Sequence, residues 1–216
     1  MKCSVGLFLG QLWLQVAVVI LLTISNANGV PNIKSLAQLS PDAEDCPKYD
    51  ESPWCPCYQF EDGVFLECPT TGISEIRTTL SLINVPIKSL GIYHLDKNIT
   101  TFPPKVFFNT SISHLLMSYT NLENLDEHAL VGLEDSLDSL SIVNSKLKDV
   151  PQKTLSTLKI LTSVDFDSNE IQKVEGYAFY GVPLTTVNLQ EQPNRKLVRI
   201  CFRRSREHTS RTYSHQ

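Results

Sequence analysis

The chain has 216 residues, with 19 Lys and Arg against 23 Asp and Glu, and a formal net charge of −4. Residues 30–194 carry eleven basic and twenty-two acidic side chains, whereas residues 195–216 carry seven and one. We therefore expect no nucleic-acid partner for the acidic body of the chain. After the first thirty residues, no segment is long and apolar enough to span a bilayer.

Residues 1–29 are predicted to be a secretory signal peptide. One lysine precedes an apolar run over residues 5–24, and Ala27 and Gly29 supply the small residues that signal cleavage requires. The alternative is a retained membrane anchor, because the apolar run is long. Two glutamines interrupt the run and no basic cluster follows it, which favours cleavage after Gly29. Residues 30–45 then form a leader without strong periodicity.

A cysteine cluster follows the leader. Four of the five cysteines that remain after signal cleavage are Cys46, Cys55, Cys57 and Cys68. In a secreted chain such a cluster is typical of a disulfide framework. Zinc is the alternative, but the one-residue spacing in the middle pair is poor for chelation and no histidine is nearby. We assign residues 46–86 to a cysteine cap and a connector, the latter a short helix or an irregular segment.

A repeated apolar pattern occupies residues 87–189. Residues 112–133, 137–158 and 161–182 each carry apolar side chains at positions 1, 4, 6, 11, 14, 19 and 22, and partial copies start at Ile87 and Leu184. A period of 23 to 25 residues with this pattern is typical of a leucine-rich repeat solenoid. Positions 4 and 6 point to the same side of a short strand, and stacked neighbours must bury that side. An ordinary leucine-rich α/β domain is the alternative. We predict an α/β fold with a short parallel concave sheet, an irregular or helical convex side and four to five repeats.

The cysteine pattern of the segment "CPKYDESPWCPCYQFEDGVFLEC" resembles the amino-terminal cap of extracellular leucine-rich repeat proteins. Within that family the chain is similar to secreted arthropod leucine-rich proteins, which include a chaoptin-like adhesion class and the non-catalytic subunit of a shrimp luciferase. The resemblance implies interleaved disulfides, Cys46–Cys57 and Cys55–Cys68, and a concave sheet that binds proteins. The gap between Cys46 and Cys55 is longer than in many such caps.

Position 9 of the repeat departs from the family pattern. The family usually has asparagine there, bonded to backbone groups at the turn after the strand. Only Asn169 keeps it, and Thr120, Ser145 and Gln192 take the other positions. Hydroxyls make related turn bonds more weakly, so we expect a less regular solenoid.

Positions 3, 5 and 7 of each repeat are predicted to face the concave side. The candidate binding residues on this face are Tyr93, His114, Leu116, Ser141, Val143, Asp165, Asp167 and Asn188. A few apolar anchors among small polar groups suit protein recognition. The alternative is a solvent-exposed sheet face that keeps the protein soluble and binds no partner.

The sequence also bears on N-glycosylation and on catalysis. The triplets that start at Asn98 and Asn109 fit N-glycosylation and fall in predicted loops. The chain has no recognisable catalytic motif, so we expect no enzyme activity, cofactor, metal or small-molecule substrate. Asp165 and Asp167 alone are too few ligands for calcium.

We conclude from the sequence that the protein is secreted and binds another secreted or cell-surface protein. The alternatives are a non-catalytic subunit that stabilises a secreted enzyme and a fragment of a cell-surface adhesion protein. Residues 190–216 are predicted to form a basic, disordered tail that contains the unpaired Cys201 and no closing cap. The last repeat would then expose its apolar end, so we expect self-association there.

Overall fold

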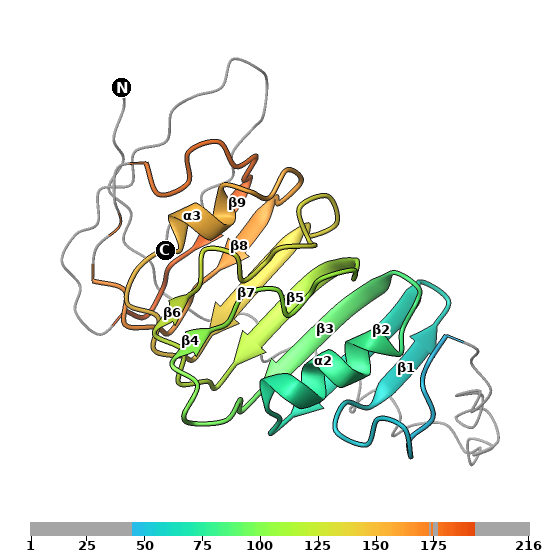
Figure 1. The fold of residues 1–216 in the computed structure, drawn as a ribbon. Helices are drawn as coiled ribbons and strands as arrows, with labels where there is room; N and C mark the ends of the chain where they lie inside the picture. The colour runs from blue at the N-terminus through green and yellow to red at the C-terminus, as the bar shows by residue number, and fades with distance from the viewer. Residues whose placement is uncertain (1–44, 173, 175–176, 193–216) are drawn as a thin grey trace, which may run out of the picture.

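The computed structural model describes residues 45–172, 174 and 177–192. Its centre is a seven-stranded sheet in the order β1-β2-β3-β5-β7-β8-β9 (Figure 1). The strands are β1 (Cys57–Phe60), β2 (Gly63–Pro69), β3 (Ile87–Tyr93), β5 (Ile112–Ser118), β7 (Ser139–Val143), β8 (Ser163–Asp165) and β9 (Thr186–Asn188). Only β1 and β2 pair in antiparallel fashion, and all later pairs are parallel.

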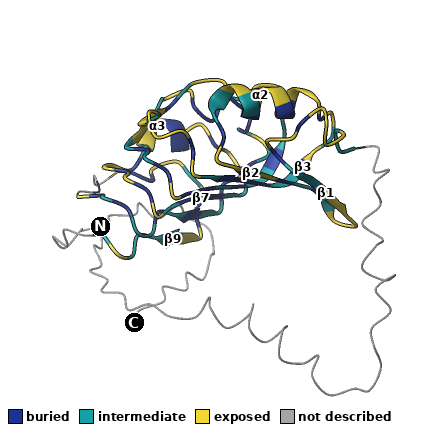
Figure 2. Cartoon of the chain, turned by 90° about the horizontal axis from the view of Figure 1, so that it is seen from below, coloured by how far each residue is buried: buried dark blue, intermediate teal, exposed yellow. Residues whose placement is uncertain are grey.

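One face of the sheet is covered by the returning segments of the repeats. These contain α2 (Ile73–Ser81), α3 (Gln152–Leu155) and a second small sheet in which β4 (Thr101–Phe102) pairs with β6 (Asn124–Leu125). Figure 2 shows α2 and α3 on the same side of the sheet, which we call the convex side. The arrangement of short parallel strands with few helices confirms the predicted solenoid.

The core is built from the strand positions that the repeat pattern marks as apolar. Leu90, Leu115, Leu140, Val164 and Val187 occupy position 4 and lie next to one another in register across five strands. The first four of these side chains are fully buried. Each repeat therefore buries its strand against the next repeat, as stacking requires.

The sheet begins before the first predicted repeat. The cap cysteines lie on a hairpin of β1 and β2, and β2 pairs directly with β3. Both implied disulfides, Cys46–Cys57 and Cys55–Cys68, are present. The connector contains the helix α2, whose buried Ile76 and Leu80 join the same core. The cap thus extends the solenoid by two strands and covers its amino-terminal end.

The position-9 side chains join successive repeats through hydrogen bonds. Asn169 Nδ2 donates to the carbonyl of Ile142 in the preceding repeat, and Gln192 Nε2 donates to that of Phe166. The hydroxyls of Thr120 and Ser145 bond to each other at 2.8 Å. Serine, threonine and glutamine therefore form the hydrogen bonds between repeats at positions where the family usually has asparagine.

The last repeat extends past the predicted start of the tail at residue 190. Because Gln192 also accepts a hydrogen bond from the backbone N–H of Ile171, residues 190–192 belong to the solenoid. The predicted signal peptide, most of the leader, Cys201 and residues 193–216 of the predicted tail lie outside the described residues.

The concave face as a candidate protein-binding surface

The candidate site is the sheet face opposite α2 and α3, which we call the concave face. Its side chains form three columns that run across the parallel strands in register. The first column is Phe65, Ser89, His114, Ser139, Ser163 and Thr186. The second is Glu67, Gly91, Leu116, Ser141, Asp165 and Asn188, and the third is Pro69, Tyr93, Ser118, Val143, Asp167 and Gln190. The strand pairings place all these residues together except Asp167 and Gln190, which lie two residues beyond the ends of β8 and β9.

The eight predicted binding residues all lie in these columns. Each of them is partly exposed, whereas the strand residues at positions 4 and 6 are buried in every repeat except the last, where Val187 and Leu189 are partly buried. Leu116 lies at the middle of the face, because β5 is the fourth of the seven strands. Its neighbours in the column are Gly91 and Ser141, so the leucine projects between small residues.

The cap hairpin adds aromatic side chains that the repeat pattern did not predict. Tyr58 pairs with Phe65, and the rings of Phe60 and Phe65 meet edge to face with centroids 5.2 Å apart. Phe60 is 51% exposed. Tyr58 and Phe60 lie two residues apart before the Glu61–Asp62 turn, and this hairpin spacing is the signal that could have placed them on one face of the sheet.

Tyr93 lies over Gly91 on the neighbouring part of the face. A Cβ atom at Gly91 would come within 2.8 Å of the Tyr93 ring, so glycine is required for this contact. Burial raises the pKa of the Tyr93 hydroxyl, and the negative charge of Glu67 raises it further. At the ends of the strands, the rings of His94 and Tyr119 stack with centroids 5.4 Å apart. Both residues occupy position 8, outside the positions 3, 5 and 7 that were predicted to face the concave side.

The opposite end of the face carries two carboxylates. Asp165 Oδ1 accepts hydrogen bonds from the backbone N–H of Asp167 at 3.0 Å and from Asn188 Nδ2 at 2.9 Å. Burial raises the pKa of the Asp165 carboxyl, and these two hydrogen bonds only partly offset that effect. Asp167 Oδ2 accepts from the Ser168 hydroxyl, but its buried Oδ1 has no hydrogen-bond partner among the described residues.

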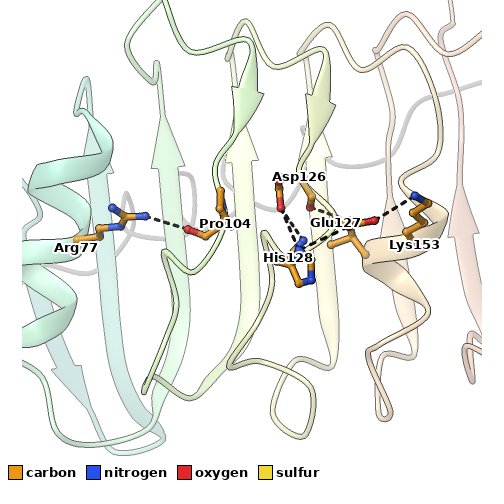
Figure 3. A network of polar contacts seen from close by, with 7 residues as sticks. Arg77, Pro104, Asp126, Glu127, His128 and Lys153 are labelled. Carbon is orange, nitrogen blue, oxygen red and sulfur yellow. Dashed lines mark hydrogen bonds and ion pairs between the residues drawn. The ribbon is translucent and has the colours of Figure 1, made fainter.

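The three columns contain no lysine or arginine. The Lys–carboxylate ion pairs found among the described residues lie outside the columns, and each joins neighbouring repeats: Lys148 with Glu123, Lys153 with Glu127 and Lys159 with Asp135. Figure 3 shows the Lys153–Glu127 pair beside His128 and Asp126, and Arg77 donating to the carbonyl of Pro104. These contacts hold Lys148, Lys153, Lys159 and Arg77 outside the three columns.

Asn98 and Asn109 lie in exposed turns outside the three columns. Within the described ranges, no group of three His, Cys, Asp or Glu side chains is placed to hold a metal ion. The part of the chain that the structure describes contains no helix of the length and hydropathy needed to cross a membrane.

Comparison with known proteins agrees with this geometry. Residues 87–209 match the family described as "BspA type leucine rich repeat region", with six copies of the repeat. Over 130 residues the chain is 28% identical to leucine-rich repeat-containing protein 3B of Danio rerio. The match covers 58% of this chain and 46% of that protein, so the chain spans about half the length of this relative.

Proposed function

Because this chain belongs to the BspA-type leucine-rich repeat family, we propose that it is a protein-binding module whose partner lies across the concave face. Leucine-rich repeat domains generally mediate protein–protein interaction. The observation that carries the proposal is the set of three columns, in which partly exposed apolar side chains such as Leu116 and Val143 stand among serines. Apolar anchors surrounded by small polar groups are the usual composition of a binding surface.

We further propose that the protein acts outside the cell and binds a secreted or cell-surface protein. The two disulfides of the cap support this, because disulfides persist mainly in oxidising compartments. The predicted signal peptide and the two exposed glycosylation triplets agree with the same route. No enzyme activity is proposed, since the sequence contains no recognisable catalytic motif.

The narrower resemblance, to arthropod adhesion proteins and to the non-catalytic luciferase subunit, stays a prediction. If the chain stabilises a secreted enzyme, that enzyme should purify with it in a fixed ratio from native secretions. If it is part of an adhesion protein, its partner should instead be a protein of the cell surface. Co-purification followed by measurement of the subunit ratio separates the two.

The proposal is tested by blocking the middle of the face. We expect Leu116→Arg in the full chain to reduce binding at least tenfold, because the new side chain places a larger, charged group at the middle of the face, next to Ser141. Gln152→Arg on α3 adds the same charge on the convex side and is the matched control. The measurement is recovery of cross-linked partners from native secretions or cell surfaces. Equal recovery by both variants would contradict a concave binding site.

A further inference from the structure

We propose that the concave face takes an extended basic segment of its partner, with an apolar residue at the cap hairpin and lysine or arginine at β8. The inference rests on the proposed function and goes further by stating the chemistry of the partner. It is carried by three observations: the aromatic end of the face, the acidic end, which has no counter-ion among the described residues, and the distance between them.

The aromatic end lies on the cap hairpin and β3. Phe60 and Phe65 form an edge-to-face pair, Tyr58 pairs with Phe65 on the adjacent strand, and Tyr93 covers Gly91. Tyr58 is 37% exposed and Phe60 is 51% exposed. Exposed aromatic rings of this kind gain stability when an apolar partner side chain removes them from water. This end therefore suits a large apolar residue.

The acidic end lies on β8 and two residues beyond it. Asp165 is partly buried, and its two hydrogen-bond donors, the Asp167 N–H and the Asn188 amide, are both neutral. The inner oxygen of Asp167 has no partner among the described residues. A buried carboxylate without a cation is unfavourable, whereas carboxylates outside the columns, such as Glu123 and Glu127, pair with lysines. A basic side chain from the partner would supply the missing counter-charge.

The middle of the face permits a chain to cross. Between the two ends the second column contains Gly91, Leu116 and Ser141, and the first contains Ser89, His114 and Ser139. Most of these side chains are small, and none is a lysine or arginine that would repel a basic segment. An extended main chain can thus lie over this floor with Leu116 as an additional apolar contact.

The distance between the ends sets the length of the segment. Four steps between neighbouring strands separate β2 from β8, and strands lie about 4.8 Å apart, so the span is about 19 Å. An extended chain advances about 3.3 Å per residue. The apolar residue and the basic residue of the partner should therefore be separated by about six positions.

The test is selection of binding peptides from a random dodecapeptide phage library on the full-length protein. We expect selected peptides to carry an aromatic or large aliphatic residue and, about six positions away, lysine or arginine. Selected peptides are then synthesised and their affinity measured by fluorescence polarisation. For the D165N/D167N variant we expect at least a tenfold loss of affinity. The matched control, D135N/D149N, removes the same charge at exposed positions outside the columns and should change affinity less than twofold.

The other outcomes would contradict either this inference or the proposed function. Equal losses in the two double variants would show general attraction to an acidic protein and would overturn the inference. Peptides without basic residues that still fail to bind Leu116→Arg would also overturn it, while the proposed function stands. Peptides that bind Leu116→Arg normally would contradict the proposed function itself. Asp165→Asn alone keeps an oxygen that can accept both hydrogen bonds, so it provides a folded variant with a smaller loss of affinity if the double variant is unstable.

Discussion

Asn169 links two repeats through more hydrogen bonds than the other position-9 residues. It is 2% exposed, accepts from the backbone N–H of Leu147, and donates to the carbonyls of Ile142, Phe166 and Asp167. Because these backbone groups are held between stacked repeats, water cannot replace the side chain. A single amide thus satisfies the turn after β8 and fastens it to β7.

We expect Asn169→Ala to lower the free energy of unfolding by about 3 kcal/mol, since it leaves several buried backbone groups without partners. Asn121→Ala is the control, because Asn121 makes one exposed hydrogen bond to the carbonyl of Lys97. We expect that variant to lie within about 0.5 kcal/mol of the original protein. Urea denaturation followed by circular dichroism measures both. Similar losses in the two variants would contradict the role given to Asn169.

Asp165 makes stability depend on pH. Burial raises its pKa above the ordinary value of 3.8, so the folded protein binds a proton in a range where the unfolded chain has lost it. Stability therefore falls as the pH rises from 3.8 through the folded pKa, and this penalty remains at neutral pH.

Asp165→Asn should remove this dependence, because asparagine can accept the same two hydrogen bonds without a charge. We expect the stability of the original protein relative to the variant to decrease through that range and then to stay constant. Chemical denaturation at a series of pH values provides the measurement. A difference that does not change with pH would show that burial of Asp165 has no energetic effect.

The turns around Gly132 and Gly181 differ in how closely they pack against the rest of the chain. Gly132 lies in the segment between β6 and β7 with a φ of +103°, and a Cβ there would meet the carbonyl oxygen of Phe107 at 2.4 Å. Gly181 occupies the same repeat position two repeats later, and it has a φ of +84° but no atom within 4 Å of its ideal Cβ. Substitution at both glycines can therefore distinguish the effect of a positive φ from the effect of close contact with the preceding repeat.

Alanine at either glycine should cost about 1–2 kcal/mol for a positive φ. At Gly132 a further 1–3 kcal/mol is expected, because the methyl group must displace backbone atoms of the neighbouring repeat. Thermal unfolding should therefore show a clearly lower midpoint for Gly132→Ala than for Gly181→Ala. Equal midpoints would mean that the segment around Phe107 moves without cost.

The cap closes the amino-terminal end of the whole solenoid. Cys55 and Cys68 are at most 1% exposed and belong to the core, whereas Cys46 and Cys57 are only partly buried. The two disulfides span 13 and 11 residues, so their effects on chain entropy are nearly the same. The difference between them should arise from packing.

We expect replacement of either disulfide by two alanines to cost about 2–4 kcal/mol. The loss should be larger for Cys55 and Cys68, because alanines there also remove buried sulfur atoms from the core. Denaturant unfolding of the two double variants gives the order. A greater loss for Cys46 and Cys57 would show that the outer disulfide, and not the core, holds the cap.

Glycans at the two predicted sites would lie outside the three columns of the concave face. Asn98 and Asn109 both lie in exposed turns of the segment between β3 and β5. Replacement of either residue by glutamine should lower the mass of the secreted protein by one glycan and leave partner binding unchanged. Mass spectrometry before and after glycosidase treatment checks the first part. An unchanged mass would show that these triplets are not used.

Periodicity was sufficient to predict the parallel sheet, its buried positions and the columns of the concave face. The reason is local: side chains alternate along a strand, so positions 4 and 6 and positions 3, 5 and 7 separate onto opposite faces in every repeat. The eight candidate residues, from Tyr93 to Asn188, could therefore be placed on one surface without knowledge of the contacts between repeats.

Only the tertiary structure shows which residues from distant parts of the sequence are in contact. The cap hairpin joins the sheet because β2 pairs with β3, and this pairing brings Phe60 and Phe65 to the end of the concave face. The same is true of the surroundings of Asp165, because its hydrogen-bond partner Asn188 comes from the next strand, and the Lys–carboxylate ion pairs of the described residues lie outside the columns. Burial and charge balance depend on contacts across the sheet, which no repeat determines by its own composition.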